Sequence, residues 1–350
     1  MKLNTIVIAI CLITVNLGIG QDLHFSQFSQ APLQMNPALT GGSEADQRAI
    51  LNYKDQWRSV AKAYRTYAFS YDLSLSKKMK TKNHLGIGVN VFAARSGDVN
   101  LSTTQADLFL AYHIKMNDHH SLSGGLRGGL SQRSINETEM QWGNQYDSNV
   151  GGYNSNMGSN ETIEFDRFLH ADFAAGLNWS YSSKNATLSS NDATQAEAGF
   201  SVLHVNAPKL NYNSVTTNET LYTRYILHGK LRQGIKNTNL QIEPGGYAQF
   251  KKTSKEIVVG ANVRYIIKEE SKYTNLVKGA AISVGTHYRI KDALIVSSYA
   301  EFGNFGVGLS YDINISGLSK ATNTKGGFEI ALLFRTPNPF KDKKSAARFM

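Results

Sequence analysis

The chain has 350 residues, of which 41% are hydrophobic and only 18% are charged, and its formal net charge is +10. An ordinary soluble domain carries about 25% charged residues, yet the mean hydropathy is slightly negative, which leaves no room for several apolar helices of about 20 residues. A bundle of membrane-spanning helices is therefore excluded, and so is a fold held by disulfides, because Cys11 is the single cysteine.

The first 20 residues have the pattern of a cleaved secretory signal. Lys2 supplies a positive charge, an apolar stretch extends from Ile6 to Val15, and Gly18 and Gly20 are small residues of the kind that a signal peptidase requires. We therefore predict a signal peptide over residues 1–20 and an exported chain after it.

Residues 21–46 do not have the pattern of a strand. They contain Pro32 and Pro37, and proline cannot donate a hydrogen bond within a sheet. We predict that this segment, with Asn36, Pro37 and Ala38 at its centre, is a plug or a periplasmic element of the domain that follows. The alternative is a plain turn that leads into the first strand.

Residues 47–336 show repeated alternation of apolar and polar residues, which is typical of strands with two unlike faces. In one segment, Leu169, Phe173 and Leu177 share a face with Trp179 and Tyr181, while polar and small residues occupy the other face. About fourteen such segments of roughly ten residues occur, and that length allows a tilted strand to cross a bilayer.

The charged residues separate a membrane barrel from a soluble sheet. On strand after strand the ionisable residues fall opposite the apolar row, among them Asp107, Arg127, Asp172, Glu197 and Glu329. We expect these charges to pair across the lumen, because buried charges are normally paired. The sequence thus predicts an all-β fold, a transmembrane antiparallel barrel of about 14 strands with a non-barrel N-terminal segment; a secreted sandwich or soluble barrel is the alternative.

Two regions outside the strands have features that are typical of partner binding. The connection between Ser134 and Arg167 is long and contains Trp142, Tyr146 and Tyr153, and aromatic side chains often anchor interfaces. We predict partner contact there, with packing at the lipid rim or disorder as alternatives. The basic tail, residues 337–350, could attract phosphorylated lipid or an acidic partner, or could simply keep the chain end soluble.

Neither catalytic chemistry nor nucleic-acid binding is indicated. The pair His119 and His120 is adjacent at a turn, which does not place two imidazoles on one face for a metal. The glycine-rich run at residues 124–129 continues a strand rather than opening a helix, so it is no phosphate loop. The positive charge lacks an aromatic-interleaved basic patch. We therefore expect no enzyme, cofactor, metal site or nucleic-acid partner.

Several motifs resemble one known family when they are taken together. They are HFSQF at residues 24–28, MNPALTG at 35–41, YKDQW at 53–57, RTYAFS at 65–70, IEP at 242–244 and the pair Tyr311 and Asp312. Because these motifs occur in this order along the chain, the chain resembles the PorP/SprF family of the Bacteroidota type IX secretion and gliding machinery. The chain departs from it at the end, where AARFM stands in place of the CPRF that often closes family members.

The resemblance implies a barrel of about fourteen strands in the cell outer membrane. It implies a role in exporting a large cell-surface adhesin with a C-terminal sorting domain, in holding that adhesin at the surface, and in contacting other secretion components. It marks Asn36, Pro37, Ala38, Gln56 and Trp57 as family-motif residues. A similar Asn-Pro-Ala occurs near the N-terminus of long-chain fatty-acid transporters, so hydrophobic-solute uptake is the alternative function.

Overall fold

The computed structural model describes residues 24–43, 45–59, 62–75, 83–97, 100–136, 140–160, 167–183, 193–210, 220–252, 254–268, 279–317 and 319–336. The predicted signal peptide over residues 1–20 and the basic tail over residues 337–350 lie outside these ranges.

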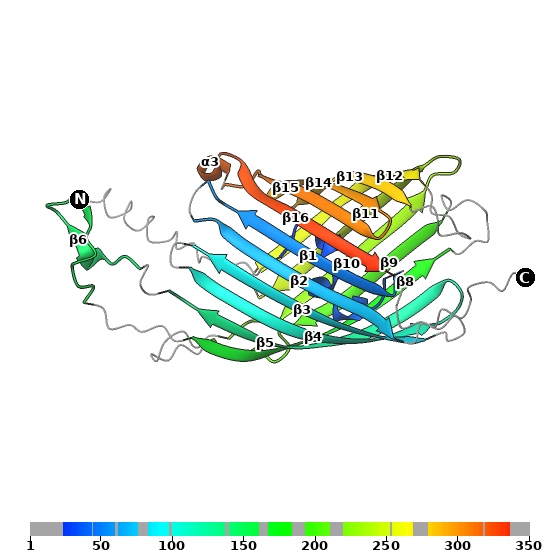
Figure 1. The fold of residues 1–350 in the computed structure, drawn as a ribbon, viewed down its shortest axis with the longest axis horizontal. Helices are drawn as coiled ribbons and strands as arrows, with labels where there is room; N and C mark the ends of the chain where they lie inside the picture. The colour runs from blue at the N-terminus through cyan, green and yellow to red at the C-terminus, as the bar shows by residue number, and fades with distance from the viewer. Residues whose placement is uncertain are drawn as a thin grey trace, which may run out of the picture.

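Fourteen antiparallel strands close into a barrel (Figure 1). Each barrel strand pairs with the next along the chain, and β5 pairs with β8 across the connection that carries the two-stranded hairpin β6–β7. The predicted fold class is confirmed. The barrel strands are β1 (Gln47–Gln56), β2 (Tyr64–Leu75), β3 (His84–Ser96), β4 (Leu101–Lys115), β5 (His120–Ser134), β8 (Phe168–Ser182), β9 (Thr194–Leu203), β10 (Arg224–Gly234), β11 (Leu240–Lys251), β12 (Ser254–Lys268), β13 (Ala280–Arg289), β14 (Ala293–Phe302), β15 (Phe305–Asn314) and β16 (Lys325–Thr336).

The first and last strands form the seam that closes the barrel. β1 pairs with β16 over its whole length, from Gln47 opposite Thr336 to Gln56 opposite Gly327. Closure gives each strand a neighbour on both sides, which removes the unpaired sheet edges that could not exist in hydrocarbon.

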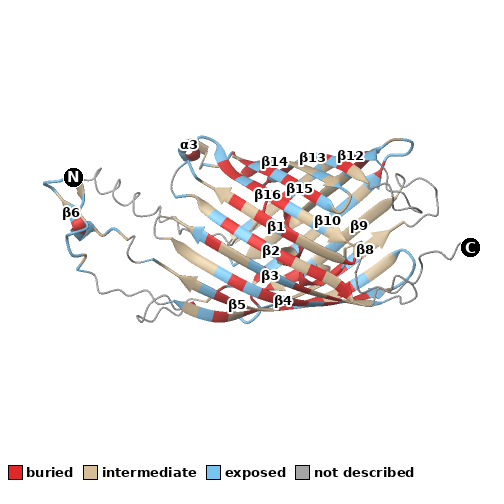
Figure 2. Ribbon diagram, viewed as in Figure 1, coloured by how far each residue is buried: buried red, intermediate tan, exposed pale blue. Residues whose placement is uncertain are grey.

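The two faces of the wall differ as the alternation predicts. On the outer face Leu108, Leu126 and Leu169 are 68%, 61% and 63% exposed, while Asp107 and Asp172 on the inner face are buried. Figure 2 shows the result as alternating buried and exposed residues along each strand. An apolar band therefore faces outward and the ionisable groups face the lumen. Some charged residues at strand ends depart from this rule and lie on the outer face, among them Asp55, Arg65, Arg95 and Lys255.

The two ends of the barrel differ in their connections. The long connection after β5 carries the short helix η4 (Gly143–Gln145) and the hairpin of β6 (Tyr146–Asp147) and β7 (Gly152–Tyr153). We call its end the hairpin end, at the left in Figure 1; the helix α3 (Ser319–Thr322), between β15 and β16, lies at the same end. The turn between β4 and β5, residues 116–119, lies at the opposite end.

No helix among the residues described is long and apolar enough to cross a membrane.

Two positions on the outward face of β5, at different depths in the membrane, allow a test of whether this face contacts lipid. Leu126 lies in the middle of β5 and Leu122 near its end, both on the outer face. We expect Leu126→Arg to destabilise the barrel by about 2–4 kcal/mol and Leu122→Arg by about 0–1 kcal/mol, because the cost of a cation falls toward the interface. Urea unfolding of the protein in lipid vesicles measures both values. Equal costs for the two variants would contradict a membrane-embedded band.

Candidate functional site

Residues 24–43, which we call the lumenal segment, lie inside the barrel and appear in dark blue behind the strands in Figure 1. The segment forms three short helical turns, η1 (Phe28–Gln30), α2 (Pro32–Met35) and η2 (Pro37–Leu39). Pro32 and Pro37 each begin a turn, a position where the missing N–H costs nothing. The segment begins beside Lys54, toward the hairpin end, and leaves beside Asp72 and His84, at the opposite end.

Glu329 on β16 holds the start of the segment. Its carboxylate accepts hydrogen bonds from the backbone N–H groups of Ser26 and Gln27 at 2.8 and 3.0 Å. It also pairs with Lys54 of β1, whose Nζ lies 2.9 Å from Oε1 and donates to the His24 carbonyl oxygen at 2.9 Å. Lys54 and Glu329 face each other directly across the seam. Both are almost fully buried, so the same ion pair joins the seam to the lumenal segment.

A second ion pair holds Ser26 from the other side. The Ser26 hydroxyl donates to Asp312 Oδ2 at 2.7 Å and accepts from Arg289 at 2.6 Å. Arg289 also donates to Asp312 at 3.1 Å. Hydrogen bonds to charged groups are the stronger class, and Ser26 is bound by charged groups from three strands.

The aromatic ring of Phe28 inserts between side chains of the far wall. It meets Tyr247 and His287 edge-on, with ring centroids 5.3 and 5.6 Å apart, and it packs with Val258 and Ile295. Edge-to-face contacts of this kind add to the gain from burial. The start of the segment is therefore held by apolar packing as well as by charge.

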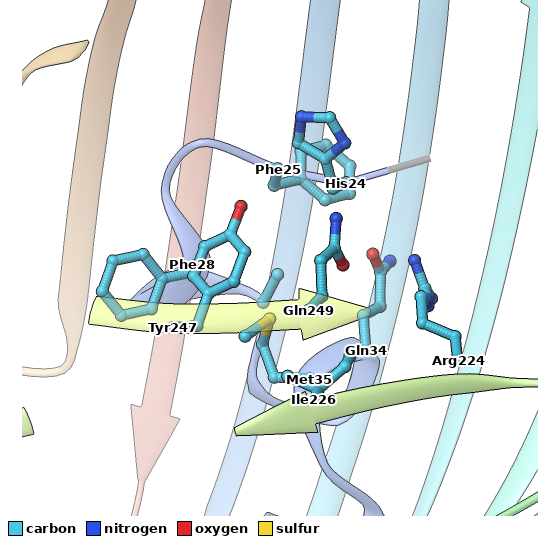
Figure 3. Close-up of a pocket in the computed structure, with 10 residues that line it drawn as sticks. His24, Phe25, Phe28, Gln34, Met35, Arg224, Ile226, Tyr247 and Gln249 are labelled. Carbon is cyan, nitrogen blue, oxygen red and sulfur yellow. The ribbon is translucent and has the colours of Figure 1, made fainter. Parts of the chain in front are cut away.

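A small cavity lies between the segment and strands β10 and β11 (Figure 3). Phe28, Met35 and Ile226 form its apolar side, while Gln34 and Arg224 contribute polar ends. The cavity is mixed in character and is confined beside the segment.

Asn36 is fully buried and joins the segment to three strands. Its Nδ2 donates to the carbonyl oxygens of Leu177 at 2.9 Å and Phe200 at 3.4 Å, and lies 3.1 Å from Nε2 of His228. Its Oδ1 accepts from the Ala38 N–H at 2.9 Å. Asn36 thus caps the turn that Pro37 begins and fastens it to β8, β9 and β10.

Glycines in the wall make room for the Asn36–Ala38 turn. A Cβ placed on Gly176 would lie 2.0 Å from Asn36 Oδ1, and one on Gly125 would lie 2.4 Å from the Pro37 carbonyl carbon. Atoms cannot approach this closely, so any other residue at either position would displace the segment.

The segment leaves the lumen beside two stacked histidines. His113 and His84 have ring centroids 4.3 Å apart, and their Nε2 atoms lie 2.7 and 3.2 Å from the carbonyl oxygens of Thr40 and Gly41. The Gly41 N–H donates to Asp72 at 2.7 Å. Gly41 has φ +67°, a conformation that glycine adopts without strain.

A separate ion cluster lies in the wall toward the hairpin end. Arg127 pairs with Asp172 and with Asp107, and Asp172 Oδ1 lies 2.9 Å from His204 Nδ1. Glu197 pairs with Lys230 at 3.5 Å. These lumenal charges and Glu329 are paired, as expected, but their partners lie on neighbouring strands of the wall rather than across the lumen.

The motif residues Gln56 and Trp57 lie away from the Asn36–Ala38 turn. Gln56 ends β1 at the hairpin end, opposite Gly327, and the Trp57 N–H donates to the Gly326 carbonyl oxygen at 2.9 Å. The Trp57 ring packs edge-on against Tyr64 at 5.0 Å. These two residues belong to the rim of the seam.

The structure brings two of the three loop aromatics together. Tyr146 and Tyr153 are partners across the hairpin and are 61% and 41% exposed. Trp142 precedes η4 and is partly buried. Asp147 holds the hairpin by accepting from the Asn149 N–H at 2.9 Å and from Asn154 Nδ2 at 3.0 Å.

Sequence reasoning did not anticipate how the wall binds the segment. It placed Glu329 on the inner face without assigning it to Ser26. Glu329 and Asp312 also offered a signal, since two carboxylates facing one lumen need donors. Among the residues described, no group of three His, Cys, Asp or Glu side chains could hold a metal ion.

A closed barrel with an apolar outer face and paired charges inside is an outer-membrane β-barrel. The chain matches the family "Type IX secretion system membrane protein PorP/SprF" over residues 18–334. It belongs to that family, and it is an outer-membrane protein.

Comparison with other known proteins adds no closer relationship. No curated protein matches the chain. Among solved structures, the toluene transporter TodX of P. putida has 10% identity and a TM-score of 0.45, covering 87% of this chain and 93% of that one. The Pseudomonas aeruginosa FadL homologue has 10% identity and a TM-score of 0.45, covering 86% and 92%. The β domain of Bordetella BrkA has 11% identity and a TM-score of 0.38, covering 83% and 99%. Similarities this low carry no functional argument.

The close fit at Gly125 allows a test with a neighbouring control. We expect Gly125→Ala to displace the turn at Pro37, so that hydrogen exchange of the lumenal-segment amides rises at least about tenfold, as lost anchoring of about 1.4 kcal/mol would produce. Gly124→Ala, on the outer face, meets only the Leu177 side chain at 3.5 Å and should leave the exchange unchanged. Equal exchange in both variants would contradict the fit.

The hydrogen bonds of the hairpin allow a prediction about the pKa of Asp147. The hydrogen bond from Asn154, followed by that from the Asn149 N–H, holds the pKa of Asp147 below its ordinary value. A carboxyl whose pKa is lowered by folding stabilises the folded form above its ordinary pKa, and this contribution is lost as pH falls through the lowered pKa. We expect Asn154→Ala to raise the pKa of Asp147 in a ¹³C NMR titration of labelled aspartate. Asn156→Ala is the control, and a shift of the same size there would contradict the assignment.

Proposed function

We propose that the chain is a noncatalytic outer-membrane barrel that supports export of a large adhesin-like partner and anchors it at the cell surface. Membership of the type IX secretion family is the observation that carries this proposal. The partner would present a C-terminal sorting domain, and other secretion components would contact the barrel. In this proposal a signal peptide over residues 1–20 is removed, and the tail over residues 337–350 faces the periplasm.

The lumenal segment serves as a plug in this proposal. It is bound by charged groups at Ser26, by wall carbonyls at Asn36 and by histidines at Thr40. Such a segment leaves the partner to dock at the outer loops or in the barrel mouth rather than pass through the barrel. The lumenal segment, residues 24–43, therefore fills part of the lumen and stays fixed there.

The hairpin end faces the cell exterior in this proposal, since barrels of this kind carry their longer loops outside. The exposed pair Tyr146 and Tyr153, together with Trp142 in the same connection, offers the aromatic side chains on which the partner's terminal domain docks. Hydrogen bonds to Asp147 hold the hairpin in shape before binding, which lowers the entropic cost of association.

Uptake of a hydrophobic solute is the alternative function. A transporter of that class needs an apolar pocket in the lumen, and purified protein would then carry bound lipid or detergent there. The inner wall carries buried charged residues such as Lys54, Asp107 and Arg289, which supports the secretion role over solute uptake.

The aromatic surface is tested in cells that display the adhesin. We expect the triple variant Trp142→Ala, Tyr146→Ala and Tyr153→Ala to lower surface-retained adhesin about tenfold or more, because aromatic anchors often contribute over 1 kcal/mol each to an interface. Surface labelling and quantitative mass spectrometry measure retention. A matched triple variant, Ser148→Ala, Ser155→Ala and Asn156→Ala, should retain the adhesin.

Full retention in the aromatic variant would overturn docking at the hairpin. Export and retention of the adhesin in cells that lack the chain would overturn the proposed function itself. Co-purification from native membrane, with accompanying proteins identified by mass, would identify the partner.

A further inference from the structure

Two arginines face each other on the outside of the barrel near the hairpin end. Arg65 on β2 and Arg95 on β3 are direct partners in the strand register. They share the outer face with Tyr67 and Val91, which are 51% and 45% exposed. Both arginines are exposed as well, so their guanidinium groups lie at the outward surface and not in the lumen.

Among the described residues at this place, the positive charge exceeds the negative charge. Asp55 is shared by Arg65, at 3.5 Å, and by Arg58, at 3.2 Å. Within the described ranges, no carboxylate forms an ion pair with Arg95. Like charges directly opposite each other destabilise a strand pair. An anion bound from outside would remove this repulsion.

The position indicates the source of the anion. Directly beside the arginines, the outer face continues into the apolar band through Tyr67, Phe69 and Val91, and Tyr53 packs against Tyr67 with ring centroids 5.1 Å apart. Tyrosines of this kind mark the level of the lipid head groups. An anion at that level, above an apolar surface, belongs to a lipid whose acyl chains lie along the band.

We propose that Arg65 and Arg95, with Arg58 beside them, bind the phosphate-monoester head group of a membrane lipid. Each guanidinium can donate two parallel hydrogen bonds to phosphate oxygens. Two opposed arginines can therefore hold one dianionic phosphate between β2 and β3, while the acyl chains cover Tyr67, Phe69 and Val91.

Native mass spectrometry of the full-length protein in detergent tests the site with two lipids that have the same acyl chains, phosphatidate and phosphatidylcholine. We expect wild-type protein to bind phosphatidate in preference to phosphatidylcholine. The variant Arg65→Gln with Arg95→Gln should bind phosphatidate about 30-fold more weakly, from about a tenfold loss per 1.4 kcal/mol and about 1 kcal/mol per arginine.

A matched control removes the same charge elsewhere at the hairpin end. Lys291 and Lys320 are exposed and belong to other connections, so Lys291→Gln with Lys320→Gln should keep wild-type binding. An equal loss in the control, equal binding of phosphatidylcholine, or displacement of the lipid by inorganic phosphate at equal concentration would each overturn the proposal. Circular dichroism and gel mobility of unheated samples confirm that each variant is a folded barrel.

Discussion

The structure depends on one constraint, which is that no backbone N–H or C=O group can stay unpaired in hydrocarbon. A sheet in a membrane can pair all of its backbone groups only if its first and last strands pair with each other. Here β1 and β16 pair over ten residue pairs. A closed wall of fourteen strands is wide, so it encloses space that its own side chains do not fill. The inner charges and the lumenal segment are both consequences of that enclosed space.

The lumenal segment is held by the same groups that hold the wall. Glu329 pairs with Lys54 across the seam and also accepts two backbone N–H groups of the segment. Removing one partner of a buried ion pair costs about 3–5 kcal/mol, because the other charge is left uncompensated. Withdrawal of the segment would likewise take the N–H groups of Ser26 and Gln27 away from Glu329, and would take the carbonyl oxygens of Leu177 and Phe200 away from Asn36. The wall at Gly125 and Gly176 is shaped to the segment, so the two behave as one packed unit.

Much of the fold could be predicted from sequence, because each strand alternates apolar residues that face lipid with polar residues that face the lumen. The alternation from Leu169 to Tyr181 is visible without any knowledge of neighbours, and β8 follows it. The contacts of the lumenal segment were harder to predict from sequence. The turn at Asn36, Pro37 and Ala38 stands out in sequence, but Asn36 binds carbonyl oxygens of Leu177 and Phe200, and backbone carbonyls have no sequence signature. Gln56 and Trp57 belong to the same family motifs and yet lie at the seam rim.

The sequence by itself determined the class of the molecule: which face of each strand meets lipid, about how many strands there are, and that most charges avoid the lipid face. These properties are local, since alternation with a period of two residues can be recognised within one strand, without knowing which strands pair with it. Only the tertiary structure decided that residues 24–43 lie within the lumen, that Glu329 joins the seam to Ser26, and that Arg65 meets Arg95 on the outer surface. Those contacts join residues far apart in the chain, and strand register and barrel closure bring them together.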